Sequence, residues 1–132
     1  MDGAAGRWQS LAMATHPLPS IVLLVEDNAV IAMNTEILLQ DLGVAQVSIA
    51  ASVAAALALI EAIRFDFAIL DVKLGDEEDS LPIADRLIAE GVPIAFATGG
   101  GEEMVPAEGY DGAAMLKKPY GFEDLERLLH GL

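Results

Sequence analysis

The segment Phe67-Ala68-Ile69-Leu70-Asp71 decides how this sequence is interpreted. Four apolar residues in a row predict a short strand that is buried on both faces. The run ends in an acid, so the Asp71 carboxylate stands where the strand leaves the sheet. Strands buried on both faces are typical of parallel sheets, which carry a layer of helices on each side.

Four further segments of the same kind surround this one. The first, Ile21-Val22-Leu23-Leu24-Val25, is wholly apolar, and further strands are predicted at 45–50, 93–97 and 113–116. Between the strands, apolar residues recur at the spacing of helices. They are Val30, Met33 and Ile37 in the first helix, Val53, Leu57 and Ile60 in the second, Ile83, Leu87 and Ile88 in the third, and Phe122, Leu125, Leu128 and Leu129 in the last.

The order of these elements predicts an α/β fold. Ser52 is suited to cap one helix and Gly43 to end another. The segment 101–108 has the weakest helical pattern and completes five strands and five helices in alternation. Because crossovers between parallel strands are right-handed, few topologies remain. We expect a flavodoxin-like (βα)5 three-layer sandwich with strand order 2-1-3-4-5, and a site at the carboxyl ends of strands 1 and 3.

Composition narrows the classes of function. The chain has 132 residues and no cysteine. Its net charge of -14 argues against nucleic acid and anionic membrane surfaces as partners. No apolar run reaches the roughly 18 residues needed to span a bilayer. We expect a cytoplasmic protein with a flexible N-terminal arm at 1–19 and one domain at 20–132, with no output domain after it.

Polar side chains collect where the predicted strands end. Glu26 and Asp27 follow the first strand, Asp71 ends the third, Thr98 ends the fourth and Lys118 follows the fifth. Three carboxylates at one edge repel each other unless a cation lies among them. Ligands that are all oxygen favour Mg²⁺ or Mn²⁺.

This constellation is suited to phosphoryl transfer. Asp71 can act as a nucleophile and become an acyl phosphate. The metal and Lys118 would neutralise charge on the phosphoryl oxygens, and Thr98 would hydrogen-bond one of them.

At these residues the sequence resembles the response-regulator receiver family of two-component signalling. The resemblance extends from position 21 to about position 129. It rests on four motifs in the right order, each at a strand end: Val25-Glu26-Asp27-Asn28, Leu70-Asp71-Val72-Lys73-Leu74-Gly75, Ala97-Thr98-Gly99 and Lys118-Pro119.

The resemblance implies a role for each motif. Asp71 would be the phosphoacceptor, and Asp27, Asp71 and the Lys73 carbonyl would bind Mg²⁺ directly, with Glu26 acting through a metal-bound water. The amides of Lys73 and Gly99 would hold the phosphoryl group. Lys118 would pair with that group, and the bond that follows Lys118 would be a cis peptide.

The resemblance also implies partners. A sensor histidine kinase or a phosphotransfer protein would donate the phosphoryl group, and an unidentified protein would receive the signal. The chain would catalyse only its own phosphorylation and dephosphorylation, and it could also serve as a relay intermediate or sink.

A narrower similarity concerns Phe96-Ala97-Thr98-Gly99, which resembles the "FAT GUY" group of stand-alone receivers in general stress signalling. Gly100 and Gly101 depart from that motif. Met115 stands at the switch position, where ordinary receivers have an aromatic residue. Because Met has no ring to move, we expect the switch to involve the loop 99–108, and Met115 itself to pack in the core.

Other interpretations remain open. Asp71 could be an ordinary loop acid, and Lys117 and the acids at 76–79 are most simply solvated. An aspartate-dependent phosphohydrolase would share the Asp nucleophile and Mg²⁺, but such enzymes typically have a second Asp where this chain has Lys73. A receiver that binds partners without being phosphorylated is the third alternative.

Overall fold

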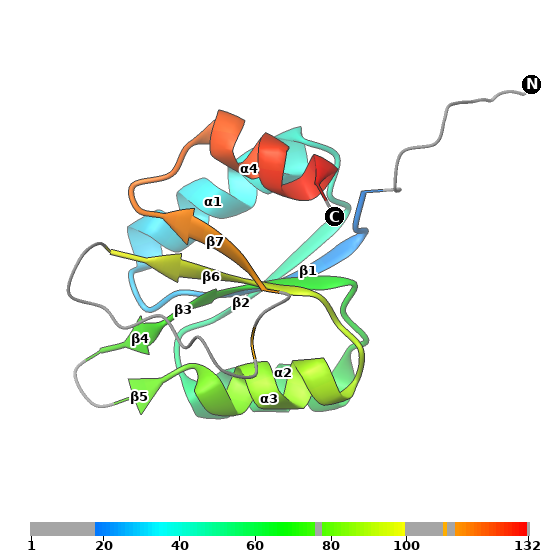
Figure 1. Cartoon of the computed structure of the whole chain (residues 1–132), viewed down its shortest axis with the longest axis vertical. Coiled ribbons are helices and arrows are strands. Elements are labelled where there is room, and N and C mark those ends of the chain that lie inside the picture. Colours follow the sequence, from blue (N-terminus) through cyan, green and yellow to red (C-terminus); the bar gives the residue numbers. More distant parts are fainter. Residues whose placement is uncertain (1–17, 76–77, 100–109, 111–112, 132) are drawn as a thin grey trace, which may run out of the picture.

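The computed structural model describes residues 18–75, 78–99, 110 and 113–131. Within these ranges the chain forms a five-stranded sheet between two layers of helices (Figure 1). Most of the predicted arm and the predicted helix at 101–108 lie outside the described residues. The last two residues of the predicted arm are described: Leu18 packs against one of the core clusters, and Pro19 is buried.

The strand order of the sheet is β2-β1-β3-β6-β7, and all neighbouring pairs are parallel. This confirms the predicted order 2-1-3-4-5, because β6 and β7 are the fourth and fifth strands of the sheet. The five strands are β1 (Ile21–Val25), β2 (Gln46–Ala50), β3 (Phe67–Asp71), β6 (Ile94–Thr98) and β7 (Ala114–Lys117).

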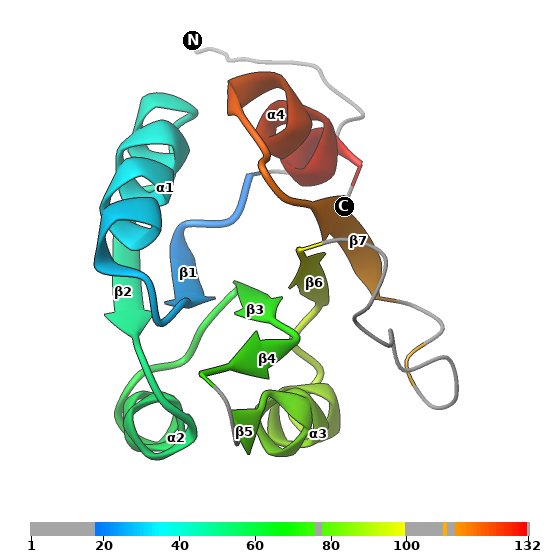
Figure 2. The same ribbon diagram turned by 90° about the vertical axis from the view of Figure 1, so that its left-hand side faces the viewer.

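In the part of the chain that the structure describes, two helices cover each face of the sheet (Figure 2). The helices α1 and α4 lie on one side, and α2 and α3 lie on the other. No helix among the described residues has the length and apolar character needed to cross a membrane. Within the described ranges the helices are α1 (Ala29–Asp41), α2 (Val53–Ala62), α3 (Leu81–Ala89) and α4 (Phe122–His130).

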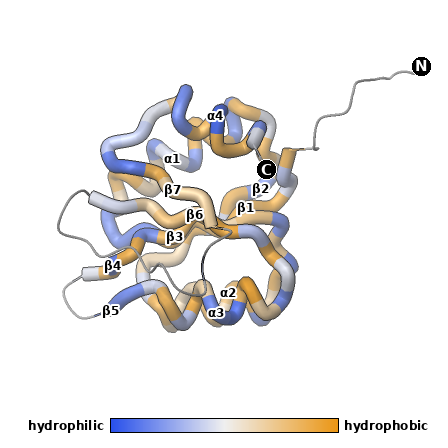
Figure 3. Tube along the Cα trace, viewed as in Figure 1, coloured by the Kyte–Doolittle hydropathy of each residue, from blue (hydrophilic) through white to orange (hydrophobic). Residues whose placement is uncertain are grey.

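The core consists of two clusters, one on each face of the sheet. Every residue of β3 is buried, as its apolar run predicts, and the central strands are mostly hydrophobic (Figure 3). Phe67 belongs to the cluster under α1 and α4, and Phe96 to the cluster under α2 and α3. Burying one such side chain contributes about 1.5–3 kcal/mol to the stability of the fold. Because the two rings lie on opposite faces of the sheet, this burial stabilises both helical layers.

The helix boundaries follow from local hydrogen bonds. The Asn28 side chain accepts hydrogen bonds from the amides of Val30 and Ile31 and so begins α1. The Ser52 hydroxyl accepts one from the Ala55 amide, which confirms the predicted cap of α2. Gly43 has a φ of +112°, a conformation that favours glycine, just after α1 ends.

The apolar residues that predict α1 do not face the core. Val30, Met33 and Ile37 are 68%, 60% and 54% exposed, whereas the buried face of α1 carries Ala32, Thr35 and Leu39. Apolar residues at helical spacing identify α1 as a helix. Because such residues occur on both faces of α1, their spacing does not show which face is buried. Ile88 in α3 and Phe122 in α4 are also exposed.

A small hairpin follows β3 and was not predicted. The strands β4 (Lys73–Leu74) and β5 (Glu78–Asp79) pair antiparallel beyond the carboxyl end of β3 (Figure 2). The interpretation of the acids at 76–79 as a solvated loop is therefore corrected in part at positions 78 and 79, whereas 76 and 77 lie outside the described residues. Both β5 residues are exposed, but the Glu78 carboxylate accepts a hydrogen bond from the Val53 amide and connects the hairpin to α2.

Candidate functional site

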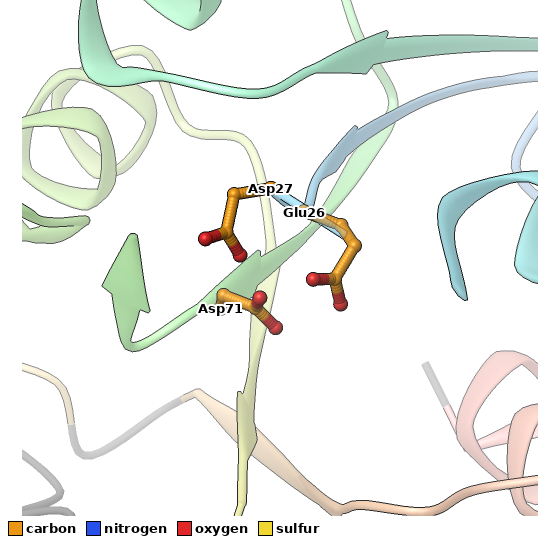
Figure 4. A group of neighbouring side chains, drawn as sticks. All are labelled: Glu26, Asp27 and Asp71. Atoms are coloured by element: carbon orange, nitrogen blue, oxygen red, sulfur yellow. The ribbon is translucent and has the colours of Figure 1, made fainter. Parts of the chain in front are cut away.

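Three carboxylates meet at the carboxyl ends of β1 and β3. Glu26 and Asp27 directly follow β1, and Asp71 is the last residue of β3. Each offers one oxygen, and these oxygens lie within 4.8 Å of one another. Figure 4 shows the three side chains gathered around a common space. The structure therefore brings together the acids that the sequence predicted at this edge.

Lys118 joins two of these acids. Its Nζ lies 2.8 Å from Glu26 Oε1 and 2.8 Å from Asp71 Oδ1. Both acids are buried, with 2% and 4% exposure, whereas the lysine side chain is 22% exposed. A buried carboxylate without a partner is strongly unfavourable, so this single cation stabilises two of them.

The charged groups of this cluster shift each other's pKa values. Burial raises the pKa of Asp71 to about 7, and the hydrogen bond with Glu26 adds to the rise, while Lys118 opposes it. Burial would also raise the pKa of Glu26, but its hydrogen bonds with Asp71, Lys118 and the Asn28 amide outweigh burial and lower it. The pair therefore tends to hold one proton, which a divalent cation would displace.

Asp27 differs from its two neighbours because it is exposed. Its Oδ2 accepts a hydrogen bond from the Gly75 amide at 3.0 Å. Gly75 has a φ of +69°, so the turn that presents this amide favours glycine. Asp27 thus connects the end of β1 to the β4–β5 hairpin as well as facing the other carboxylates.

The ends of β6 and β7 complete the edge. The Lys118 amide donates a hydrogen bond to the Thr98 carbonyl at 2.8 Å, which places both residues at the same edge as Asp71. The bond between Lys118 and Pro119 is cis, as expected. Lys73 begins β4 two residues after Asp71, and Gly99 directly follows Thr98. The roles of their backbone groups stay predictions.

Met115 lies on β7, opposite Phe96 of β6, and is 46% exposed. The expectation that it packs in the core is wrong. Leu116 takes the inward position on this edge strand, and side chains alternate along a strand, so Met115 turns to the other side. The proposed switch loop, 99–108, lies outside the described residues except for Gly99.

Tyr120 is a residue that the sequence interpretation missed. Its hydroxyl lies 3.2 Å from the Thr35 hydroxyl, so it connects α1 to the segment after Lys118. Burial raises the pKa of the Tyr120 hydroxyl. In the sequence, Tyr120 could be noticed only as an aromatic residue directly after Lys118 and Pro119. Its hydrogen-bond partner, Thr35, is 85 residues away, so residue spacing does not reveal the pair.

Comparison with known proteins agrees with this geometry. The family model of the response regulator receiver domain matches residues 22–130. The chain belongs to this family, whose members are phosphoacceptors in two-component signalling. A comparison with curated proteins returned no match.

Similar solved structures are receiver proteins. The solution structure of SdrG from Sphingomonas melonis Fr1 is 38% identical, with a TM-score of 0.72, and the match covers 82% of this chain and 91% of that one. The BeF3-activated conformation of SdrG from Pseudomonas melonis Fr1 is 37% identical, with a TM-score of 0.71 and coverage of 83% and 92%. A CheY-like receiver domain from Methylobacillus flagellatus, at 23% identity and a TM-score of 0.74, covers 85% and 97% and shares the fold.

Proposed function

We propose that this chain is a single-domain response regulator of the cytoplasm that accepts a phosphoryl group on Asp71 in the presence of Mg²⁺. The observation that carries the proposal is the shared cation, because Lys118 Nζ lies 2.8 Å from oxygens of both Asp71 and Glu26. An ammonium group held there can also neutralise a phosphoryl oxygen attached to Asp71.

The residues present fit a divalent ion. Three carboxylates with oxygens within 4.8 Å of one another form an oxygen-only set, which suits Mg²⁺ or Mn²⁺ better than zinc. Asp27, Asp71 and the Lys73 carbonyl would hold the ion directly, and Glu26 through a water. When bound, the ion supplies positive charge next to the reacting phosphoryl group.

The chemistry falls to Asp71 and its neighbours. An ionised Asp71 oxygen attacks the phosphorus of a phosphohistidine, and the phosphorus–nitrogen bond breaks. Its electron pair stays on the imidazole nitrogen, which takes up a proton from solvent. Lys118 neutralises the phosphoryl oxygens, the Thr98 hydroxyl donates a hydrogen bond to one of them, and the amides of Lys73 and Gly99 donate others.

Dephosphorylation returns the site to its starting state. A water oxygen attacks the phosphorus, and the Asp71 carboxylate leaves with the electron pair of the broken bond. Inorganic phosphate departs with the protons of the water. Before that, the phosphorylated chain signals through protein contacts or passes the group on as a relay intermediate or sink.

The exposed face of α1 supports a protein as phosphodonor. Val30, Met33 and Ile37 form an apolar stripe on the surface, which is typical of a docking face. Beside it lies a cavity of about 430 Å³, which includes Lys118 in its lining. A helix of a histidine kinase or phosphotransfer protein seated there would reach the phosphoacceptor site. The lining residues are Ile31, Asn34, Thr35, Leu38, Gly99, Lys118, Pro119 and Tyr120.

Incubation with acetyl phosphate and Mg²⁺ tests the proposal. We expect the intact mass to increase by one phosphoryl group, and the increase to disappear when Mg²⁺ is removed with a chelator beforehand. Release of inorganic phosphate without a lasting mass increase would instead indicate a phosphohydrolase. No reaction would indicate a receiver that binds partners without phosphorylation.

A further inference from the structure

Tyr110 makes three contacts that the function described so far does not use. Its ring meets the Phe96 ring edge-on, with centroids 5.6 Å apart and an interplanar angle of 82°. Its hydroxyl donates a hydrogen bond to Asp85 Oδ1 on α3. Its carbonyl accepts a hydrogen bond from the Ala113 amide at 3.0 Å, directly before β7.

Phe96 links Tyr110 to the reacting edge. The Phe96 ring is fully buried in the middle of β6, two residues before Thr98. The residue between them, Ala97, pairs with Asp71, and its carbonyl accepts the Val72 amide at 3.1 Å. Because protein cores are close-packed, a change in the packing of the Phe96 ring displaces neighbouring residues of this strand.

Asp85 fixes the outer end of Tyr110. The hydrogen bond to Asp85 raises the pKa of Tyr110 to about 12, so the hydroxyl remains a donor throughout the neutral range. The helix that carries Asp85 is itself held, because α3 buries Ile83, Ala84 and Leu87. Tyr110 is therefore fastened between a fixed helix and the central aromatic residue of β6.

We propose that Tyr110 is a positioning residue for Thr98: its hydrogen bond to Asp85 braces the Phe96 ring and stabilises the arrangement of β6 found in the unphosphorylated protein. This inference rests on the proposed phosphorylation of Asp71. Met115 does not supply such a brace, because it lies nearly half exposed on the neighbouring edge strand.

The proposed role of the Tyr110–Asp85 hydrogen bond predicts a change in the affinity for a phosphoryl mimic. If the bond stabilises the unphosphorylated arrangement, its loss raises the fraction of protein that is ready to bind a phosphoryl group, and the apparent affinity for a mimic rises in proportion. A hydrogen bond with a net contribution of about 1 kcal/mol corresponds to roughly a fivefold change in affinity.

The experiment titrates beryllofluoride into the full chain with Mg²⁺ and follows the Thr98 and Gly99 amides by NMR. Tyr110→Phe and Asp85→Ala should each tighten binding roughly fivefold. They should also move both amide signals of the free protein toward their bound positions. The double variant should match either single one, because both changes remove the same bond. Asp85→Asn keeps an acceptor oxygen and should restore wild-type affinity.

A matched control removes another side-chain contact of α3. Glu61→Gln weakens the 3.2 Å ion pair between Glu61 and Arg86, which does not reach β6, and should leave beryllofluoride affinity unchanged. Unchanged affinity in Tyr110→Phe and Asp85→Ala, or additive effects in the double variant, would overturn the positioning role alone. A wild-type chain that does not bind beryllofluoride would overturn the proposed phosphorylation and this inference together.

Discussion

The acid cluster has a buried half and an exposed half, and the two differ in what restrains them. Glu26 and Asp71 are almost fully buried and share the Lys118 ammonium group, whereas Asp27 is exposed and bonds to the hairpin through the Gly75 amide. The buried half therefore sets the charge and reactivity of the site. The exposed half, Asp27, is the carboxylate of the cluster that solvent reaches.

The largest expected effect comes from the buried half. Asp71→Asn should abolish phosphorylation by acetyl phosphate, because an amide is a poor nucleophile and lacks the charge of the carboxylate. The intact mass after incubation is the measurement. A phosphoryl group that persists on the variant would show that another residue is the acceptor.

Lys118→Ala should have the next largest effect, because it removes the cation from both buried acids. We expect phosphorylation to slow by about 10²-fold or more, in line with the loss of one group that stabilises the transition state. Stability should fall by about 1–3 kcal/mol in denaturant unfolding, since two buried carboxylates lose a partner. Lys117→Ala is the control, because Lys117 is an exposed neighbour on β7, and it should change neither quantity by much.

In the exposed half, Asp27→Ala should weaken Mg²⁺ binding by about tenfold or more, since one of three carboxylates is lost. Calorimetric titration with Mg²⁺ measures this. Asp41→Ala, which removes an exposed acid at the far end of α1, should leave the affinity unchanged. Equal affinities in wild type and Asp27→Ala would contradict the assigned metal ligands.

The phosphodonor surface is tested by Met33→Glu, which places a charge in the apolar stripe of α1. Transfer from a cognate kinase should slow by about tenfold, as expected when one apolar contact is replaced by a charge. Phosphorylation by acetyl phosphate should be unchanged. Ile88→Glu makes the same kind of change on an exposed residue of α3, on the opposite face, and should affect neither reaction.

The last prediction is a pH dependence of stability. The pKa of Asp71 is raised to about 7, so the metal-free folded chain keeps a proton that the unfolded chain loses near pH 4. The free energy of unfolding should therefore fall as pH rises from about 4 to about 7. Urea unfolding with a chelator across this range measures it. Saturating Mg²⁺ should cancel the fall, and Asp71→Asn should lack this contribution.

The sheet and most of the acid cluster could be predicted because their signals are local. An apolar run of four or five residues that ends in Asp71 or Glu26 identifies both a buried strand and its functional end. Parallel topology then brings those ends together. The Ser52 cap and the stop at Gly43 are equally local, since each depends on residues within one helical turn.

Features that depend on distant partners could not be predicted. The Thr35–Tyr120 and Asp85–Tyr110 bonds join residues 85 and 25 positions apart, and no periodic pattern links them. The β4 and β5 strands are two residues each, too short to show an alternation. The buried face of α1 was missed because it carries the small Ala32 and Thr35 beside Leu39, whereas the larger side chains at the predicted positions face solvent.

The most direct test of the central claim is to identify the residue that carries the phosphoryl group. After incubation with acetyl phosphate and Mg²⁺, borohydride reduces an aspartyl phosphate to homoserine, and peptide mass spectrometry locates the converted residue. We expect conversion at Asp71 alone, and none without Mg²⁺. Conversion at Asp27 or another acid, with Asp71 intact, would contradict the account.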